Sequence, residues 1–238
     1  MKKLSTLSLV MLMTLGAIAQ VKFGVKAGLN FANIAENYQD SQDESKTKLN
    51  TGFHLGVIAT QELSEVIDFT TGLIYSQKGA AFDLEDGLPS GVSIDGYDRL
   101  TISYLEIPMT FEYKTGAVRI MAGPYVAFGI SGKNKWDYTV SSGGSSVDES
   151  GEFTDIKFKN TVGESEASDD NEYFRALDLG LNIGLGYEIN NLVISANYGL
   201  GFSNLIPDVD ISGVEFDAGD FKTSNRVISV GATYYFGN

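Results

Sequence analysis

Few residues in this chain have the types and spacing that catalysis requires. His54 is the single histidine among 238 residues, and cysteine is absent. The chain can therefore form neither a disulfide nor a thiolate metal site, and one histidine cannot make a histidine-rich metal centre. Serine and aspartate are plentiful near His54, so an enzyme that acts on lipids through His54 is one hypothesis. No Ser-His-Asp spacing is evident that strand pairing would bring together, and we expect no catalytic residue, cofactor or metal.

A second group of side chains is charged and recurs at alternate positions of otherwise apolar or small segments. Four are basic and four acidic, which suits a tight interior because an unpaired buried charge is costly. Two roles remain open: a structural network that fixes strand register, or a narrow ion path with midway gates at Lys26, Glu106 and Asp178. The network comprises Lys26, Asp68, Lys78, Glu106, Glu112, Arg119 and Asp178, with Lys22 at one end.

These charges lie on segments of about ten residues with strict alternation. A period of two residues indicates a β-strand with one apolar face. In the segment 177–187 one face is bulky and unbroken, whereas the other carries Gly180, Asn182, Gly184 and Gly186. Small residues fit a narrow barrel interior, and the bulky face fits lipid. The sequence predicts an all-β fold, an eight-stranded antiparallel up-and-down transmembrane barrel, with strands at 21–31, 51–62, 66–82, 100–113, 117–131, 175–189, 192–202 and 225–236.

The connections alternate between tight turns and long segments, as in outer-membrane barrels. One tight turn is Asn190-Asn191, which sets Ile189 opposite Leu192. A four-residue turn at 114–117 sets Tyr113 opposite Val118 and, next inward, Glu112 opposite Arg119. The proline at each of positions 108 and 124 predicts a bulge. The long external loops are expected at 32–50, 82–99, 132–174 and 203–225.

The net charge of −14 is concentrated in those four long segments. So acidic a chain lacks the basic face that nucleic-acid binding needs, so we expect no nucleic-acid partner. Solvated loops are the simplest interpretation, and collecting cations or binding a partner is the alternative. The stretch 141–146, Ser-Ser-Gly-Gly-Ser-Ser, predicts flexibility, and residues 151–159 could extend as a hairpin.

The first 19 residues have the pattern of a cleaved secretion signal. Lys2 and Lys3 precede an apolar run, and Ala17-Ile18-Ala19 forms the expected cleavage site. We expect export through the periplasm to the outer membrane and one barrel domain over residues 20–238. Its partners are then outer-membrane lipids, the barrel insertion machinery and an unknown ligand or protein at the external loops.

Several short motifs resemble a known family. They are Val25-Lys26-Ala27-Gly28-Leu29-Asn30, Tyr104-Leu105-Glu106-Ile107-Pro108-Met109, Ala122-Gly123-Pro124-Tyr125-Val126 and Asp178-Leu179-Gly180-Leu181-Asn182. The chain resembles the small outer-membrane β-barrels of Bacteroidetes-type bacteria, described as porin-like or PorT-like. The resemblance covers the mature chain and implies the fold, but no agreed substrate. We expect a structural or loop-mediated role without catalysis; the alternatives are a narrow porin-like passage and the lipid-active enzyme.

Overall fold

The computed structural model describes residues 21–38, 47–82, 84, 88–153, 156–169, 171–211, 214–216 and 221–237. The predicted secretion signal, residues 1–19, lies outside the described residues. The elements are β1 (Val21–Tyr38), β2 (Thr47–Lys48), β3 (Asn50–Ser64), β4 (Ile67–Phe82), β5 (Val92–Thr115), β6 (Val118–Ser142), β7 (Ser145–Phe153), β8 (Lys157–Phe158), β9 (Thr161–Gly163), α2 (Glu164–Ala167), β10 (Tyr173–Phe174), β11 (Leu177–Ile189), β12 (Leu192–Gly201), β13 (Asp208–Ile211), β14 (Val214–Phe216) and β15 (Phe221–Phe236).

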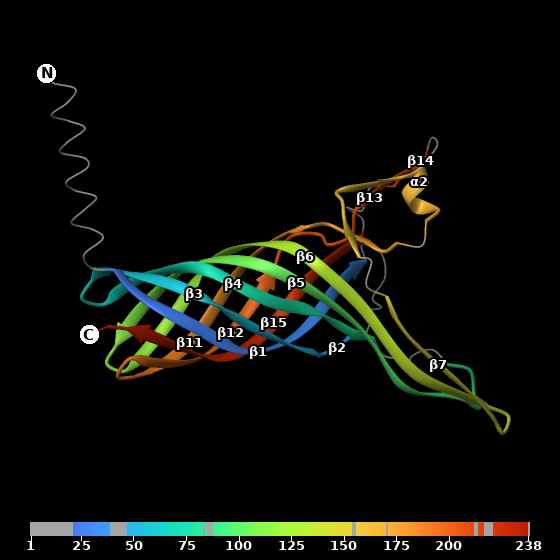
Figure 1. Ribbon diagram of the computed structural model, residues 1–238, viewed down its shortest axis with the longest axis horizontal. Helices are drawn as coiled ribbons and strands as arrows, with labels where there is room; N and C mark the ends of the chain where they lie inside the picture. Colours follow the sequence, from blue (N-terminus) through green and yellow to red (C-terminus); the bar gives the residue numbers. More distant parts are fainter. Residues whose placement is uncertain are drawn as a thin grey trace, which may run out of the picture.

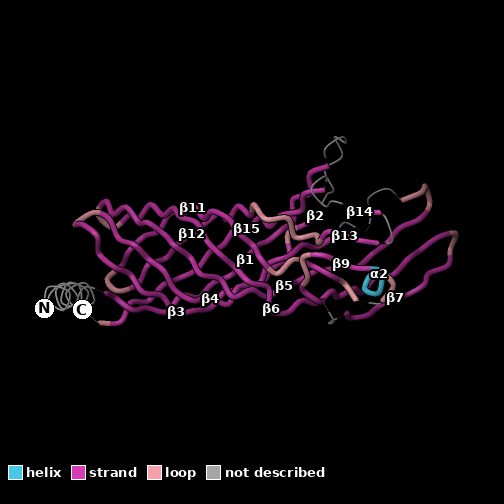
Figure 2. Tube along the Cα trace, turned by 90° about the horizontal axis from the view of Figure 1, so that it is seen from above, coloured by secondary structure: helices cyan, strands magenta, loops and turns pink. Residues whose placement is uncertain are grey.

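Eight of these strands close into a barrel. The hydrogen-bonded order is β1, β3, β4, β5, β6, β11, β12 and β15, and β15 pairs back onto β1. Neighbouring strands in this ring are antiparallel. Each pairs with the ring strand that comes next to it in the sequence. Figures 1 and 2 show the barrel from two sides, with its strands slanting across the long axis. Closure pairs the backbone of each ring strand on both sides, and the predicted eight-stranded antiparallel barrel is confirmed.

The two faces of the barrel wall differ as the alternation predicts. Large apolar side chains such as Val57 and Leu185 are each 60 % exposed on the outside. The lumen buries many polar side chains, among them Asn30, Ser76 and Thr70, beside an apolar group formed by Ile58, Ile74, Val193 and Tyr235. A soluble barrel would place its apolar residues inside, so this arrangement suits a lipid exterior.

The short connections lie together at one end of the barrel. Asn190-Asn191 joins β11 to β12 with Ile189 opposite Leu192, as predicted, and Asn190 has the positive φ of 54° that this turn requires. The β5–β6 turn differs from the prediction. It is the two-residue Gly116-Ala117, so Thr115 is opposite Val118. Gly116, at φ 61°, allows the tighter turn.

The strands continue well into the segments that were expected to be loops. β1 runs to residue 38, β5 begins at residue 92, and β6 runs to residue 142. β6 and β7 form a hairpin around Gly143-Gly144, so the stretch predicted to be flexible is a hairpin tip. Adjacent strands can continue their backbone hydrogen bonds in water, where polar side chains are accepted on both faces. The bulges predicted at the prolines are not observed; a register shift lies between Ser103 and Tyr104 instead.

Candidate functional site

The charged residues predicted for the barrel interior do face the lumen. Six of them are buried, namely Asp68, Lys78, Glu106, Glu112, Arg119 and Asp178. Lys26 is partly exposed, and Lys22 at the end of the same strand is exposed. The buried charges do not form one network but gather in two clusters. We call them the outer cluster, on the side of the long loops, and the inner cluster, on the side of the short turns.

The outer cluster is centred on the Lys78 ammonium. Its Nζ lies 2.8 Å from Glu106 Oε2 and 3.1 Å from Asp178 Oδ2. The ammonium also lies 4.1 Å from the centre of the Tyr125 ring, within range of a cation–π interaction. Asp178 accepts a further hydrogen bond of 2.9 Å from Asn225 Nδ2. Three strands, β4, β5 and β11, therefore contribute charges that compensate one another, and neutral groups such as Asn225 and Tyr125 complete the contacts.

The inner cluster is centred on the Arg119 guanidinium. Nη1 lies 3.0 Å from both Asp68 Oδ2 and Glu112 Oε2, and Nη2 donates to Glu188 Oε2 at 2.8 Å. Lys114 Nζ completes the cluster at 2.8 Å from Asp68 Oδ1. The planar guanidinium thus holds carboxylates from β4, β5 and β11 at once.

The predicted cross-strand pairing of Glu112 with Arg119 is wrong. In the observed register Glu112 is opposite Met121, and Arg119 is opposite Lys114. The tighter turn shifts the register by two residues, which keeps both side chains on the lumen face. They therefore still meet diagonally.

Glu188 and Lys114 were missed by the sequence reasoning. Glu188 is separated from the predicted Asp178 by an even number of residues in β11, and Lys114 is likewise separated from Glu112 in β5. Each therefore lies on the same face of its strand as the predicted residue. Both sit at strand ends, which makes them look like turn residues. Extending the alternation to the last strand residue would have identified them.

A cavity of about 70 Å³, here called the chamber, lies between the two clusters. It has room for a few water molecules. Lys26 and His54 line it, together with Glu106 toward the outer cluster and Glu112 toward the inner one. The remaining wall is mixed. Its polar part includes Ser76, Thr110, Asn182, Ser195, Asn197, Ser229 and Thr233, and its apolar part includes the buried cluster of Ile58, Ile74, Val193 and Tyr235.

His54 is buried in this wall and is not arranged for catalysis. Its Nδ1 lies 2.9 Å from Asn30 Oδ1. Ser76 is directly opposite His54 across the β3–β4 pair, but the Ser76 hydroxyl accepts a 3.0 Å hydrogen bond from Asn30. Among the described residues, neither a serine hydroxyl nor a carboxylate is hydrogen-bonded to the His54 ring. The structure therefore does not assemble a nucleophile and base at His54.

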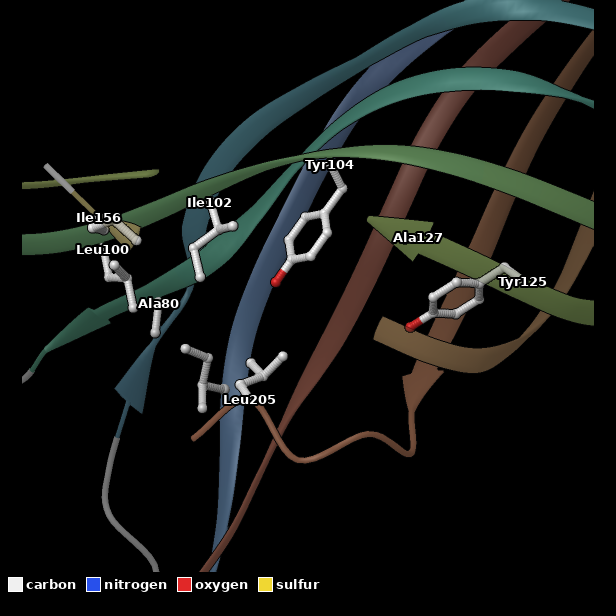
Figure 3. Packing of buried hydrophobic residues seen from close by; sticks show 9 residues of the cluster. Ala80, Leu100, Ile102, Tyr104, Tyr125, Ala127, Ile156 and Leu205 are labelled. Atoms are coloured by element: carbon white, nitrogen blue, oxygen red, sulfur yellow. The ribbon is translucent and has the colours of Figure 1, made fainter. Parts of the chain in front are cut away.

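The outer end of the lumen is filled by an apolar cluster to which the long connections contribute. Leu205, fully buried, lies in the segment after β12, and Ile156 lies in the segment after β7. Figure 3 shows Leu205 reaching toward side chains on the barrel strands, with Tyr104 and Tyr125 nearby. The other buried members are Ile34, Ala80, Leu100, Ile102 and Ala127.

Two glycines of β6 make room for this closure. A Cβ at Gly132 would lie 2.8 Å from the Ile156 side chain, and a Cβ at Gly129 would lie 2.4 Å from the Phe158 ring. Any larger residue would displace these contacts. The sequence does not determine whether the long segment turns back over the barrel mouth, and the structure shows that it does. The burial of Ile156 and Leu205 depends on long-range contacts that alternation cannot reveal.

A carboxyl pair lies beside this closure, outside the membrane-spanning region. Asn134 is hydrogen-bonded to both Asp98 and Glu172. Burial raises the pKa of the Asp98 carboxyl above its ordinary value of 3.8. Burial, with a smaller effect of the Asp98 charge, likewise raises the pKa of Glu172. Each proton is therefore bound more tightly when the segment is docked.

Beyond the mouth, the chain projects as a three-stranded ribbon formed by residues 92–99 of β5, residues 134–142 of β6, and β7 (Figure 1). One of its faces carries an apolar row, in which Val140 lies between Ile94 and Val147 across the three strands; Asp98 and Glu149 lie on the same face. The Trp136 ring lies over Gly151, where a Cβ would approach it to 2.3 Å. Among the described strands, β7 ends the hydrogen-bonded path, so its outer edge is unpaired.

The described residues contain no group of three or more histidine, aspartate or glutamate side chains placed to hold a metal ion. None of their helices is long and apolar enough to span a membrane.

Comparison with known proteins identifies the family. The family model described as "Outer membrane protein beta-barrel domain" matches residues 17–207. A search of curated proteins found no match.

Among solved structures, Ail, the attachment invasion locus protein of Yersinia pestis, is 15 % identical over 91 % of this chain and 99 % of its own, with a TM-score of 0.39. Neisserial surface protein A is 14 % identical over 90 % and 97 %, with a TM-score of 0.36. A major outer membrane protein of Thermus thermophilus is 15 % identical over 91 % and 99 %, with a TM-score of 0.35. Similarity at this level carries no information about function.

Proposed function

Because the chain belongs to the outer membrane protein beta-barrel domain family, we propose that it is a closed membrane anchor that acts through its external surface. The observation that carries this proposal is the filling of the lumen. The Arg119 and Lys78 clusters occupy it from the short turns outward, and the cluster around Leu205 fills the outer end. A barrel of eight strands has little interior space beyond its own side chains. The role is then structural or contact-based, without catalysis.

The ribbon is the surface best suited to contact. Long connections of outer-membrane barrels face outward and short turns face the periplasm, which places the ribbon outside the cell. Its apolar row includes Val147, 59 % exposed, and its β7 edge leaves backbone groups unpaired. Exposed apolar surface and a free strand edge are both features of surfaces that bind partners.

A narrow passage for small solutes or ions is the second candidate. The chamber favours it, because charged and polar side chains line part of a space that water can fill. The dense packing at the outer end weighs against it. The lipid-active enzyme is not proposed, since His54 has no nucleophile hydrogen-bonded to it among the described residues.

The finer assignments remain part of the proposal. The four quoted motifs support a place among the porin-like or PorT-like barrels of Bacteroidetes-type bacteria. The Lys2-Lys3 start and the Ala17-Ile18-Ala19 site support export by a cleaved signal. Insertion by the barrel machinery follows from membership of an outer-membrane family.

Site-specific cross-linking in intact outer membranes tests the contact role. The chain lacks cysteine, so Val147→Cys on the ribbon and Ile183→Cys on the outside of the barrel each carry one photoreactive label. We expect a discrete protein or polysaccharide adduct from Val147→Cys, and lipid adducts alone from Ile183→Cys. The adduct should weaken strongly when Ile94 and Val140, which lie beside Val147 on the same face, are both replaced by Asn while the label stays at Val147→Cys. Lipid adducts alone from every ribbon position would contradict the proposal.

A further inference from the structure

The chamber contains one cationic group that has no direct partner. Lys26 projects from β1 into the space between the two clusters. The described residues provide neither an ion pair nor a hydrogen bond to its ammonium, in contrast to Lys78 and Arg119. The carboxylates of Glu106 and Glu112 attract the Lys26 ammonium from a distance, whereas its burial away from water opposes the charge. The attraction of these carboxylates, and not a direct contact, is what compensates this cost.

Counting charges explains that field. The outer cluster combines one cation, Lys78, with two carboxylates. The inner cluster combines Lys114 and Arg119 with four carboxylates, those of Asp68, Glu112 and Glu188 and, at 3.8 Å from Lys114 Nζ, that of the more exposed Glu62. With all these groups ionised, the outer cluster carries one negative charge in excess and the inner cluster two, and the chamber lies between them. Such a space favours a cation, because low-dielectric walls strengthen the field.

His54 supplies a second, independent observation. Asn30 Nδ2 donates to the Gln77 carbonyl oxygen at 2.9 Å, which can only accept. This fixes Asn30 Oδ1 as the atom facing His54 Nδ1, so Nδ1 carries the proton. Nε2 of the neutral ring is then a bare acceptor. The side chain is 5 % exposed, and Nε2 has no hydrogen-bond partner among the described residues.

We propose that the chamber is a monovalent-cation site of the ammonium and alkali class, and that the Lys26 ammonium occupies it as a tethered cation. The chamber offers negative charge from both ends, and the His54 ring lines its wall, with Nε2 buried beside Gly231. Lys26 supplies the matching positive charge from a side chain that is covalently attached to β1. A free cation is thereby kept out of the lumen. This inference is independent of the proposed contact role.

The absence of cysteine permits a matched test. Lys26→Cys is alkylated in urea either with an aminoethylating reagent, which restores an ammonium, or with a methylating reagent, which leaves a neutral thioether. Both forms are refolded in detergent. The midpoint temperature of unfolding of each form is measured from the heat-dependent gel shift. The measurement is made in potassium or ammonium chloride and, at equal ionic strength, in N-methylglucamine chloride. The glucamine ion is too large for the chamber.

We expect the methylated form to unfold about 3–6 °C higher in potassium or ammonium than in glucamine. A shift of this size corresponds to a cation concentration about ten times the Kd of the chamber. The aminoethylated form should show no difference. Equal midpoints for the methylated form in all salts would overturn the proposal. Refolding of this form in potassium but not in glucamine would support it, whereas failure to refold in any salt would contradict it, since a free cation should replace the ammonium.

Lys22 provides the control position. It lies on the same strand and face as Lys26 but is exposed at the strand end. The methylated and aminoethylated forms of Lys22→Cys should respond identically to the choice of cation. A cation effect at Lys22 as large as that at Lys26 would show a general surface response, and the assignment of the chamber would fail.

Discussion

The two ends of the lumen are closed by different chemistry. At the outer end Lys78 shares its charge with two carboxylates, and the apolar cluster with Leu205 fills the mouth above. At the inner end Arg119 holds three carboxylates, and the side chain of Glu188 is 31 % exposed. The outer cluster is shielded from water, whereas part of the inner cluster is exposed to solvent at the end with the short turns.

This difference determines how much each end depends on single residues. A buried charge that loses its partner can neither find another nor reach water, so the loss is severe. A partly exposed charge is screened by solvent, and its ion pair contributes little. The outer end should therefore be fragile to single substitutions, and the inner end should tolerate them at its partly exposed members, Lys114 and Glu188, although not at the buried Arg119.

The largest effect is expected for Lys78→Met, which keeps the length of the side chain and removes its charge. Glu106 and Asp178 would then face each other without a cation. The free energy of unfolding, measured by urea titration of the refolded barrel, should fall by about 3–5 kcal/mol. Lys114→Met is the matched change at the inner end and should cost less than about 1 kcal/mol. Equal losses would refute the contrast between the ends.

The next effect concerns the apolar closure. Leu205→Ala removes a fully buried side chain and should weaken docking of the outer segments by about 2–5 kcal/mol. Tryptic cleavage after Lys157 and Lys159 should accelerate while the heat-dependent gel shift of the barrel persists. Ile206→Ala, at the partly exposed neighbour, is the control and should leave cleavage nearly unchanged. Unchanged cleavage in Leu205→Ala would show that this side chain does not hold the closure.

A double-mutant cycle addresses the inner cluster. Glu112→Gln should destabilise by about 1–3 kcal/mol, because Arg119 loses one of its carboxylates. Combining it with Arg119→Gln should recover part of that loss, with a coupling energy of about 0.5–3 kcal/mol. Additive effects in urea unfolding would mean that the two side chains do not act as a pair.

The smallest effect is a pH dependence of the outer closure. The pKa values of Asp98 and Glu172 are raised in the docked state, so docking binds protons and strengthens as the pH falls. This gain is complete below their ordinary values of 3.8 and 4.5 and is lost as the pH rises through the docked values. A spin label at Ser165→Cys should lose mobility from pH 7 to pH 4. Adding Asp98→Asn with Glu172→Gln should abolish the change, and a change that persists would assign it to other groups.

The barrel was predictable because alternation is a local property. Each strand shows its two faces in its own residues, and the Asn190-Asn191 turn fixes its register independently. The interior charges followed from the same alternation, even though the register at Arg119 was wrong by two residues. A shift by an even number preserves the face, which is why Glu112 and Arg119 both face the lumen although the predicted register was wrong.

The outer end was not predictable for the same physical reason. Leu205 and Ile156 lie in segments without alternation, and their burial results from contacts with distant strands. In the sequence, Gly129 and Gly132 look like ordinary small interior residues. Their role becomes evident only from the Phe158 and Ile156 side chains that pack on them. The partners of Lys78 likewise come from β5 and β11, far apart in the chain, so the division into two clusters required the closed ring.

The most direct test of the closed lumen is the conductance of the refolded full-length barrel in planar lipid bilayers. The filled outer end and the two ion clusters predict a flat current trace at both polarities, in salt of any cation. Discrete current steps from protein that shows the heat-dependent gel shift would contradict the closed anchor and establish a passage through the chamber.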